Sequence, residues 1–151
     1  MARTNTLKIW GRMSSINVKK VVWTAQELGL VFQRNEAGGQ FGLVKTPEYL
    51  RLNPNALVPV MEDGDFVLWE SNVIVRYLCA KHSPGQLYPN DLRERFEAER
   101  WMDWQQTTLG PAGRPGFCQI APPHWAPASD RFFTVVSTTR KMRTAATSLQ
   151  M

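Results

Sequence analysis

Cysteine and histidine are scarce in this 151-residue sequence, and a long apolar run is absent from it. The two cysteines, Cys79 and Cys118, lie far apart, so they form neither a Cys-x-x-Cys redox pair nor a close-spaced framework of disulfides or metal ligands. No stretch reaches the roughly 18 apolar residues that a membrane span needs. Residues 1–6 lack the apolar core of a secretory signal. We therefore expect a cytoplasmic protein with no membrane partner.

Two further kinds of partner find no support in the sequence. The formal net charge is +5, but the lysines and arginines form no dense stripe interleaved with aromatic residues, and no nucleic-acid motif is present. We interpret the charge as solvated faces and expect no nucleic-acid partner. His82 and His124 have no acidic neighbours at ligand spacing, so we expect no metal site.

Length and composition indicate a globular chain with one complete domain and part of another. Hydrophobic residues make up 43% of the sequence and charged residues 21%, which is typical of globular proteins. A compact α/β unit needs about 80 residues, whereas two full domains need about 100 to 150 each. We expect a first domain at residues 1–83 and a truncated helical one at residues 88–151.

Apolar periodicity predicts a strand, a helix and a second strand at the start of the first domain. Leu7–Trp10 is the first strand, and the second begins at Leu30. Between them, residues 16–28 place one apolar stripe on a helix: Val18, Val21, Val22, Ala25 and Leu28. Gly29 suits the C-cap of this helix, and the unit leaves room for a parallel strand pair with a right-handed crossover.

A short helix and a hairpin follow. Thr46 and Pro47 predict a helix start, with the threonine as cap and the proline at the first position. Apolar strands at 58–61 and 66–69 flank Glu62-Asp63-Gly64-Asp65, whose Asp-Gly pair is a strong hairpin signal.

Two longer helices are expected on either side of the break at 83–85. Ser71 can cap the first helix, which completes the order β-α-β-α-β-β-α at about residue 82. Asp91 and Glu94 form a capping arrangement for the second helix, at about 91–109. Six of its residues are expected to face inward: Leu92, Phe96, Trp101, Met102, Trp104 and Leu109.

The remaining sequence gives weaker signals. Residues 110–127 contain five prolines and three glycines, so a long helix cannot continue through them. From Ser129 onward the sequence shows no clear period, and both a helix and a disordered tail stay open. Fixing the backbone costs about 1–2 kcal/mol of conformational entropy per residue, and the small apolar surface of this segment offsets little of that cost.

The most informative motif combines a proline inside an apolar strand with an acid and a hydroxyl at a helix start. Pro59 lies between Val58 and Val60, where it cannot donate to a strand ladder, so we expect a cis Val58–Pro59 bond that turns main-chain groups toward a ligand. Glu70 and Ser71 supply an acceptor and a hydroxyl beside free helix amides. These groups suit the ammonium and carboxylate of an amino acid, which suggests a peptide-binding site.

With these motifs the chain resembles the glutathione transferases, in particular the serine-dependent phi, theta and bacterial types. The resemblance covers about residues 6–109 and includes Asn53-Pro54, the hairpin at 62–65, the run 69–78 and Leu87-Tyr88-Pro89. It implies an α/β thioredoxin-like N-terminal domain with a mixed four-stranded sheet, followed by an all-α region that is incomplete here. It also implies that glutathione is the cosubstrate, that its thiolate is conjugated to hydrophobic electrophiles, and that the protein forms a homodimer.

The resemblance assigns a catalytic role to a serine in the first loop. Ser15 is the first choice and Ser14 the reserve for the hydroxyl that donates to the sulfur of glutathione and favours its thiolate. The positive end of the following helix, with Lys19 and Lys20, would help to lower the pKa of that thiol. Ser15 can equally serve as a plain helix N-cap.

The resemblance also assigns the binding residues for glutathione. The main chain of Val58, before Pro59, pairs with the cysteinyl part, while Glu70 and Ser71 hold the γ-glutamyl end. Lys45 falls near the basic residue that meets the glycyl carboxylate, although a solvated loop lysine is the other interpretation.

Two other functions stay open at this point. One is a truncated or frame-shifted chain that is catalytically impaired and survives as a glutathione-binding or interaction module, which the change of composition at about Ser129 favours. The other is glutathione-dependent peroxide or disulfide reduction, which is less favoured because no cysteine occupies the first loop.

Overall fold

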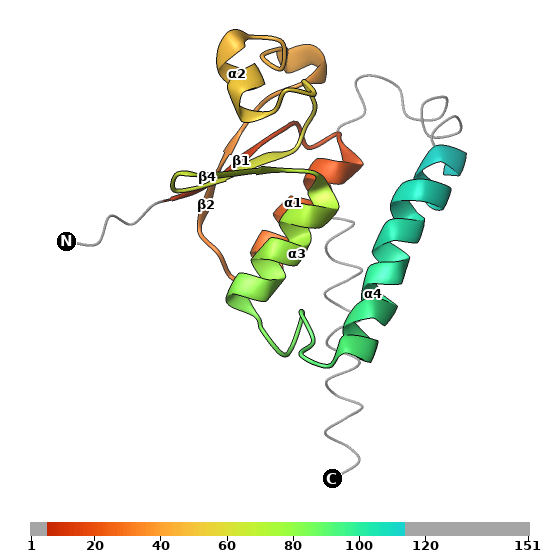
Figure 1. Cartoon of the computed structure of the whole chain (residues 1–151). Helices are drawn as coiled ribbons and strands as arrows, with labels where there is room; N and C mark the ends of the chain where they lie inside the picture. The colour runs from red at the N-terminus through yellow and green to blue at the C-terminus, as the bar shows by residue number, and fades with distance from the viewer. Residues whose placement is uncertain (1–5, 114–151) are drawn as a thin grey trace, which may run out of the picture. The chain divides into compact units, whose positions relative to one another are not determined.

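The computed structural model describes residues 6–113, so the predictions for Cys118, His124 and the tail from Ser129 lie outside it (Figure 1). The elements follow in this order: β1 (Leu7–Trp10), α1 (Ile16–Glu27), β2 (Phe32–Asn35), the 3₁₀ turn η1 (Gly39–Phe41), α2 (Pro47–Leu52), β3 (Val60–Asp63), β4 (Phe66–Trp69), α3 (Ser71–His82), α4 (Leu92–Trp104) and the π-helical segment η2 (Gln105–Leu109). None of the helices among the described residues is long and apolar enough to cross a membrane.

The four strands form one mixed sheet in the order β2-β1-β3-β4. β1 pairs in parallel with β2, and β3 pairs antiparallel with both β1 and β4. The parallel pair needs the crossover that α1 supplies, and the antiparallel pair β3–β4 needs only the turn at Gly64-Asp65. This is the thioredoxin-like arrangement that the family resemblance implied.

The two faces of the sheet bury different side chains, because successive strand residues point to opposite sides. Ile9 and Met61 are fully buried on the face that α1 and α3 cover, and Figure 1 shows these two helices side by side. The predicted stripe of α1 packs into the same cluster: Val18, Val21, Val22 and Ala25 are buried, with Leu28 at its edge. On the opposite face Val60 packs with Tyr49 of α2.

α4 begins as predicted and then differs from the prediction. Asp91 caps it, because its carboxylate accepts from the amides of Arg93 and Glu94, both at 3.0 Å. Five of the six residues expected to face inward are instead 42–61% exposed: Leu92, Phe96, Trp101, Trp104 and Leu109. The rings of Trp101 and Trp104 meet edge to face, with centroids 5.5 Å apart. No residue of α4 is buried, and Met102 is the one of the six that is partly buried.

Candidate functional site

The first part of the site is the loop that leads from β1 into α1. The amide of Gly11 donates to the carbonyl of Asn35 at 2.8 Å, and the amide of Arg12 donates to the carbonyl of Ala37 at 3.1 Å. The loop therefore continues the pairing of β1 with β2. A Cβ on Gly11 would lie 2.4 Å from Val18 and 3.2 Å from Val58, so only glycine lets the loop approach Val58 this closely.

The second part is the turn before β3. The Val58–Pro59 peptide bond is cis, as the sequence predicted. Pro59 is buried and the β3 ladder starts only at Val60, so the missing amide proton falls outside the ladder. The predicted strand start at Val58 is therefore two residues too early.

Two side chains that the sequence reasoning did not single out hold this turn in place. The hydroxyl of Tyr49 and the amide of Asn53 each donate to the carbonyl of Leu57, at 2.9 Å in both cases. Asn53 is 2% exposed, and its Oδ1 accepts from the amide of Asn55 at 3.0 Å. Burial raises the pKa of Tyr49 to about 12. The Asn53-Pro54 motif was the available signal, but its role depends on a contact that only the fold makes visible.

Ser15 occupies the N-cap of α1 with an extended backbone (φ −84°, ψ 122°), and its side chain makes no capping hydrogen bond. Its hydroxyl is therefore not committed to the helix. Ser15 is partly buried, whereas Ser14 is exposed. Because the amides of the first helical turn have no partner within the helix, the N-terminus of α1 carries partial positive charge at Ser15.

The start of α3 corrects one prediction. Ser71 is the first helical residue, and Glu70 occupies the N-cap position without a side-chain cap. The predicted capping by Ser71 is wrong because Glu70 makes the turn, with φ at 72°. This left-handed backbone costs a non-glycine residue about 1–3 kcal/mol and is often found at ligand sites. Glu70 is exposed and Ser71 is 2% exposed, so the carboxylate faces outward while the serine lies against the fold.

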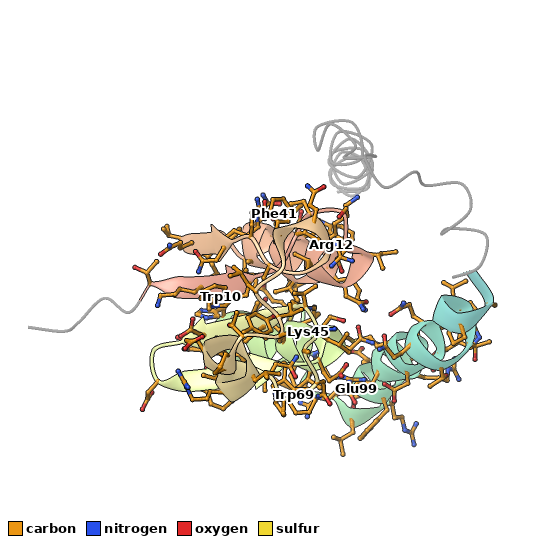
Figure 2. All side chains as sticks on the ribbon, turned by 90° about the horizontal axis from the view of Figure 1, so that it is seen from above. Trp10, Arg12, Phe41, Lys45, Trp69 and Glu99 are labelled. Carbon is orange, nitrogen blue, oxygen red and sulfur yellow. The ribbon has the colours of Figure 1, made fainter. Side chains whose placement is uncertain are left out.

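Lys45 lies in the loop before α2, directly before the Thr46 cap, whose Oγ1 accepts from the amide of Tyr49 at 3.3 Å. The side chain of Lys45 is exposed. In the view of Figure 2 it lies between Arg12, from the β1–α1 loop, and Trp69, the residue before Glu70.

Other reactive groups among the described residues are less suited to chemistry. Cys79 is 7% exposed in α3, and burial raises the pKa of its thiol, as expected of a core cysteine. Residues 6–113 contain no group of three or more side chains that could hold a metal ion.

Comparison with known proteins places these features among glutathione transferases. The family model of the glutathione S-transferase N-terminal domain matches residues 5–80. The chain is similar to glutathione S-transferase GstB of Escherichia coli K12, with 46% identity over 110 residues that cover 72% of this chain and 53% of the relative. It is also similar to the probable glutathione S-transferase GSTF2 of Oryza sativa, with 33% identity over 72% of this chain and 51% of the relative. The chain spans about half the length of these curated relatives.

The solved structures to which the chain is similar are also glutathione transferases. A theta class glutathione S-transferase from Xanthomonas axonopodis pv. citri, with glutathione bound, superposes with a TM-score of 0.76 at 43% identity, over 85% of this chain and 60% of that chain. Glutathione transferase F2 from Populus trichocarpa superposes with a TM-score of 0.71 at 28% identity, over 83% of this chain and 60% of that chain.

Proposed function

The chain belongs to the glutathione S-transferase family, and we propose that it binds glutathione in its first domain and transfers the thiolate to electrophilic hydrophobic compounds. The observation that carries this proposal is the meeting of two segments. Gly11, in the loop that ends at Ser15, lies so near Val58 that an added Cβ would be 3.2 Å from it, and Val58 directly precedes the cis-proline. This proximity supports a site in which a bound cysteinyl group reaches both segments.

At the cysteinyl part, the main chain of Val58 would pair with the peptide and the hydroxyl of Ser15 would donate to the sulfur. Lowering the pKa of the thiol from its usual value of about 8.5 requires about 1.4 kcal/mol per unit. A hydrogen bond to the charged sulfur, together with the N-terminus of α1, supplies one or two such units. Ser14, which is one residue further from the helix, is the second candidate.

At the ends of the tripeptide, opposite charges recognise the ligand. The exposed carboxylate of Glu70 would accept from the γ-glutamyl ammonium, while Ser71 and the first amides of α3 would hold the neighbouring carboxylate. Lys45 would meet the glycyl carboxylate. Since conjugation needs only a positioned thiolate and an electrophile, proximity and charge stabilisation supply the chemistry.

The division into a glutathione domain at residues 1–83 and part of a helical domain at residues 88–151 is a proposal of the same kind. The hydrophobic electrophile would contact the helical region, a homodimer would be the assembly, and the cytoplasm would be the location.

A catalytically impaired glutathione-binding module is the second candidate function. The exposed apolar face of α4 favours it. Titration calorimetry with glutathione on wild type and Ser15→Ala, together with conjugation of a generic aryl halide, separates the two. Binding in both with turnover only in wild type supports the transferase, and binding without turnover in either supports the module. If wild type does not bind millimolar glutathione, both proposals fail.

A further inference from the structure

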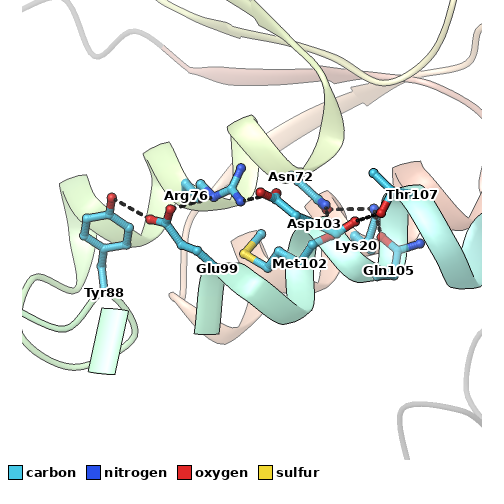
Figure 3. A network of polar contacts seen from close by, with 9 residues as sticks. All are labelled: Lys20, Asn72, Arg76, Tyr88, Glu99, Met102, Asp103, Gln105 and Thr107. Atoms are coloured by element: carbon cyan, nitrogen blue, oxygen red, sulfur yellow. Dashed lines mark hydrogen bonds and ion pairs between the residues drawn. The ribbon is translucent and has the colours of Figure 1, made fainter. Parts of the chain in front are cut away.

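Lys20 joins three helical elements through one ammonium group. It lies on α1, and its Nζ donates to Oδ1 of Asn72 at 2.8 Å and to Oε1 of Gln105 at 2.9 Å. Nδ2 of Asn72 then donates to the carbonyl of Met102 at 2.8 Å. Figure 3 shows these contacts in a row that connects α1, the first turn of α3 and the end of α4.

The side-chain amide of Asn72 is held in one orientation by its buried position and its two partners. Asn72 is 8% exposed, so its amide has little water to replace a lost partner. The amide oxygen must face the ammonium of Lys20 and the amide nitrogen must face the carbonyl of Met102. A flipped amide would place its N–H donors against the ammonium, which is also a donor. Burial lowers the pKa of Lys20, and the negative charge of Glu70 opposes this.

Asn72 directly follows Ser71 in the first turn of α3. The amides of this turn have no partner within the helix, and the Glu70 side chain does not cap it. The position of the turn therefore depends on side-chain anchors, of which the Lys20–Asn72 hydrogen bond is one. The left-handed backbone of Glu70 lies directly before this anchor.

We propose that Lys20 is a positioning residue for the γ-glutamyl end of the glutathione site. It holds Asn72 and thereby the turn that carries Glu70 and Ser71. This inference rests on the proposed function, since it needs glutathione to bind at that turn. It assigns Lys20 to the γ-glutamyl end, in place of the expectation that its charge acts on the thiol.

The same lysine ties this turn to the helical region. Both Met102 and Gln105 lie where α4 passes into the π-helical segment η2, a type of helix irregularity that is frequent at functional sites. Movement at the end of α4 would therefore reach the γ-glutamyl end through Lys20.

The test is calorimetric binding of glutathione and of γ-glutamylcysteine, which lacks the glycyl carboxylate, to four variants. Lys20→Met should weaken both ligands by the same factor, about tenfold. Lys20→Arg should restore most of the affinity, because a guanidinium can donate to both amide oxygens. Lys45→Ala should weaken glutathione only. Arg100→Met is the charge-matched control, since Arg100 pairs with Glu97 and lies over the ring of Trp101 on the exposed side of α4.

A second route covers the case in which Lys20→Met does not fold. Asn72→Ala breaks the same anchor from the other side and should give the same loss for both ligands. Where Lys20→Met does fold, the losses of the two single variants should not add in the double variant, as expected of one shared contact. Equal affinity of wild type and Lys20→Met for glutathione overturns the inference while the proposed function stands. A larger loss for glutathione than for γ-glutamylcysteine also overturns it. Such a result would mean that the contacts of the glycyl carboxylate are weakened as well, as in a general loosening of the site. Absence of glutathione binding by wild type defeats the proposed function itself, and the inference with it.

Discussion

The hydroxyl of Tyr49 donates to the carbonyl of Leu57 at 2.9 Å, and this hydrogen bond ties α2 to the residue before Val58. Asn53 donates to the same carbonyl at the same distance. The backbone proposed to meet the cysteinyl part of glutathione is therefore held by two donors from a single short helix and its C-cap.

Tyr49→Phe should lower the free energy of unfolding by about 0.5–1.5 kcal/mol at neutral pH, the usual contribution of one hydrogen bond. The loss stays moderate because Asn53 still satisfies the Leu57 carbonyl. Urea unfolding measures it. Tyr88→Phe is the matched control, since the Tyr88 hydroxyl donates to Glu99 at 3.3 Å, far from this turn. An equal loss in both variants would argue against a special role for Tyr49.

Tyr49→Phe should also reduce the loss of stability that occurs at alkaline pH. The pKa of Tyr49 is raised to about 12 in the folded protein, against about 10 when unfolded. The unfolded state therefore loses this proton first, and the stability from Tyr49 is fully present below about pH 10 and is lost as the pH rises toward 12. Unfolding titrations across this window should show a shallower loss for Tyr49→Phe than for wild type. Parallel curves would contradict the assignment.

Asn53→Ala should cost more than Tyr49→Phe, about 2–3 kcal/mol, because the buried amide loses both its donor and its acceptor contact. The double variant should cost more than the two single losses together, since only then does the Leu57 carbonyl lose both donors. Chemical unfolding of the four proteins completes the cycle. Simple additivity would show that the two side chains do not share this carbonyl as a common partner.

Ser15→Ala should leave stability almost unchanged. Removal of a working N-cap side chain costs about 0.5–2 kcal/mol, but the Ser15 hydroxyl makes no capping bond. The effect should appear at the ligand instead, as a rise of about one to two units in the pKa of the bound thiol. Thiolate absorbance of the glutathione complex as a function of pH measures this rise. Ser14→Ala should give a smaller rise, and the reverse order would assign the role to Ser14.

Asp63 should stabilise the folded protein at neutral pH, and this contribution should be lost in acid. Partial burial alone would raise the pKa of Asp63, but hydrogen bonds from Lys81 and Tyr77 outweigh it and hold the pKa below its usual value. The contribution is therefore present above about pH 4 and is lost as the pH falls through the lowered pKa. Asp63→Asn should cost roughly 0.5–1 kcal/mol at pH 7 and little at pH 2. Asp65→Asn, at the exposed turn, is the control for this comparison.

Much of the fold could be predicted because its signals are local. The stripe on α1 follows from the spacing of Val18, Val21, Val22 and Ala25, and each of these side chains is buried. The cap of α2 at Thr46 and the cap of α4 at Asp91 follow from residue type and position. The cis bond could be predicted because few other backbones accommodate proline between Val58 and Val60.

The remaining features depend on contacts that the sequence does not display. The positive φ of Glu70 belongs to a residue type that rarely adopts it, so the sequence predicts Ser71 as the cap. The role of Tyr49 depends on a carbonyl eight residues away. For α4, the apolar pattern indicates that the helix needs a partner, but it does not indicate which element provides one. Among the described residues Trp101 stays 55% exposed.

The edge-to-face pair of Trp101 and Trp104 makes α4 an intrinsic optical reporter. Indole emission shifts to shorter wavelength when water leaves the ring, and neighbouring perpendicular indoles give a coupled near-ultraviolet dichroism signal. Binding of a molecule to this helix would therefore change the tryptophan fluorescence and the near-ultraviolet dichroism of the protein, and its detection would require neither a label nor turnover.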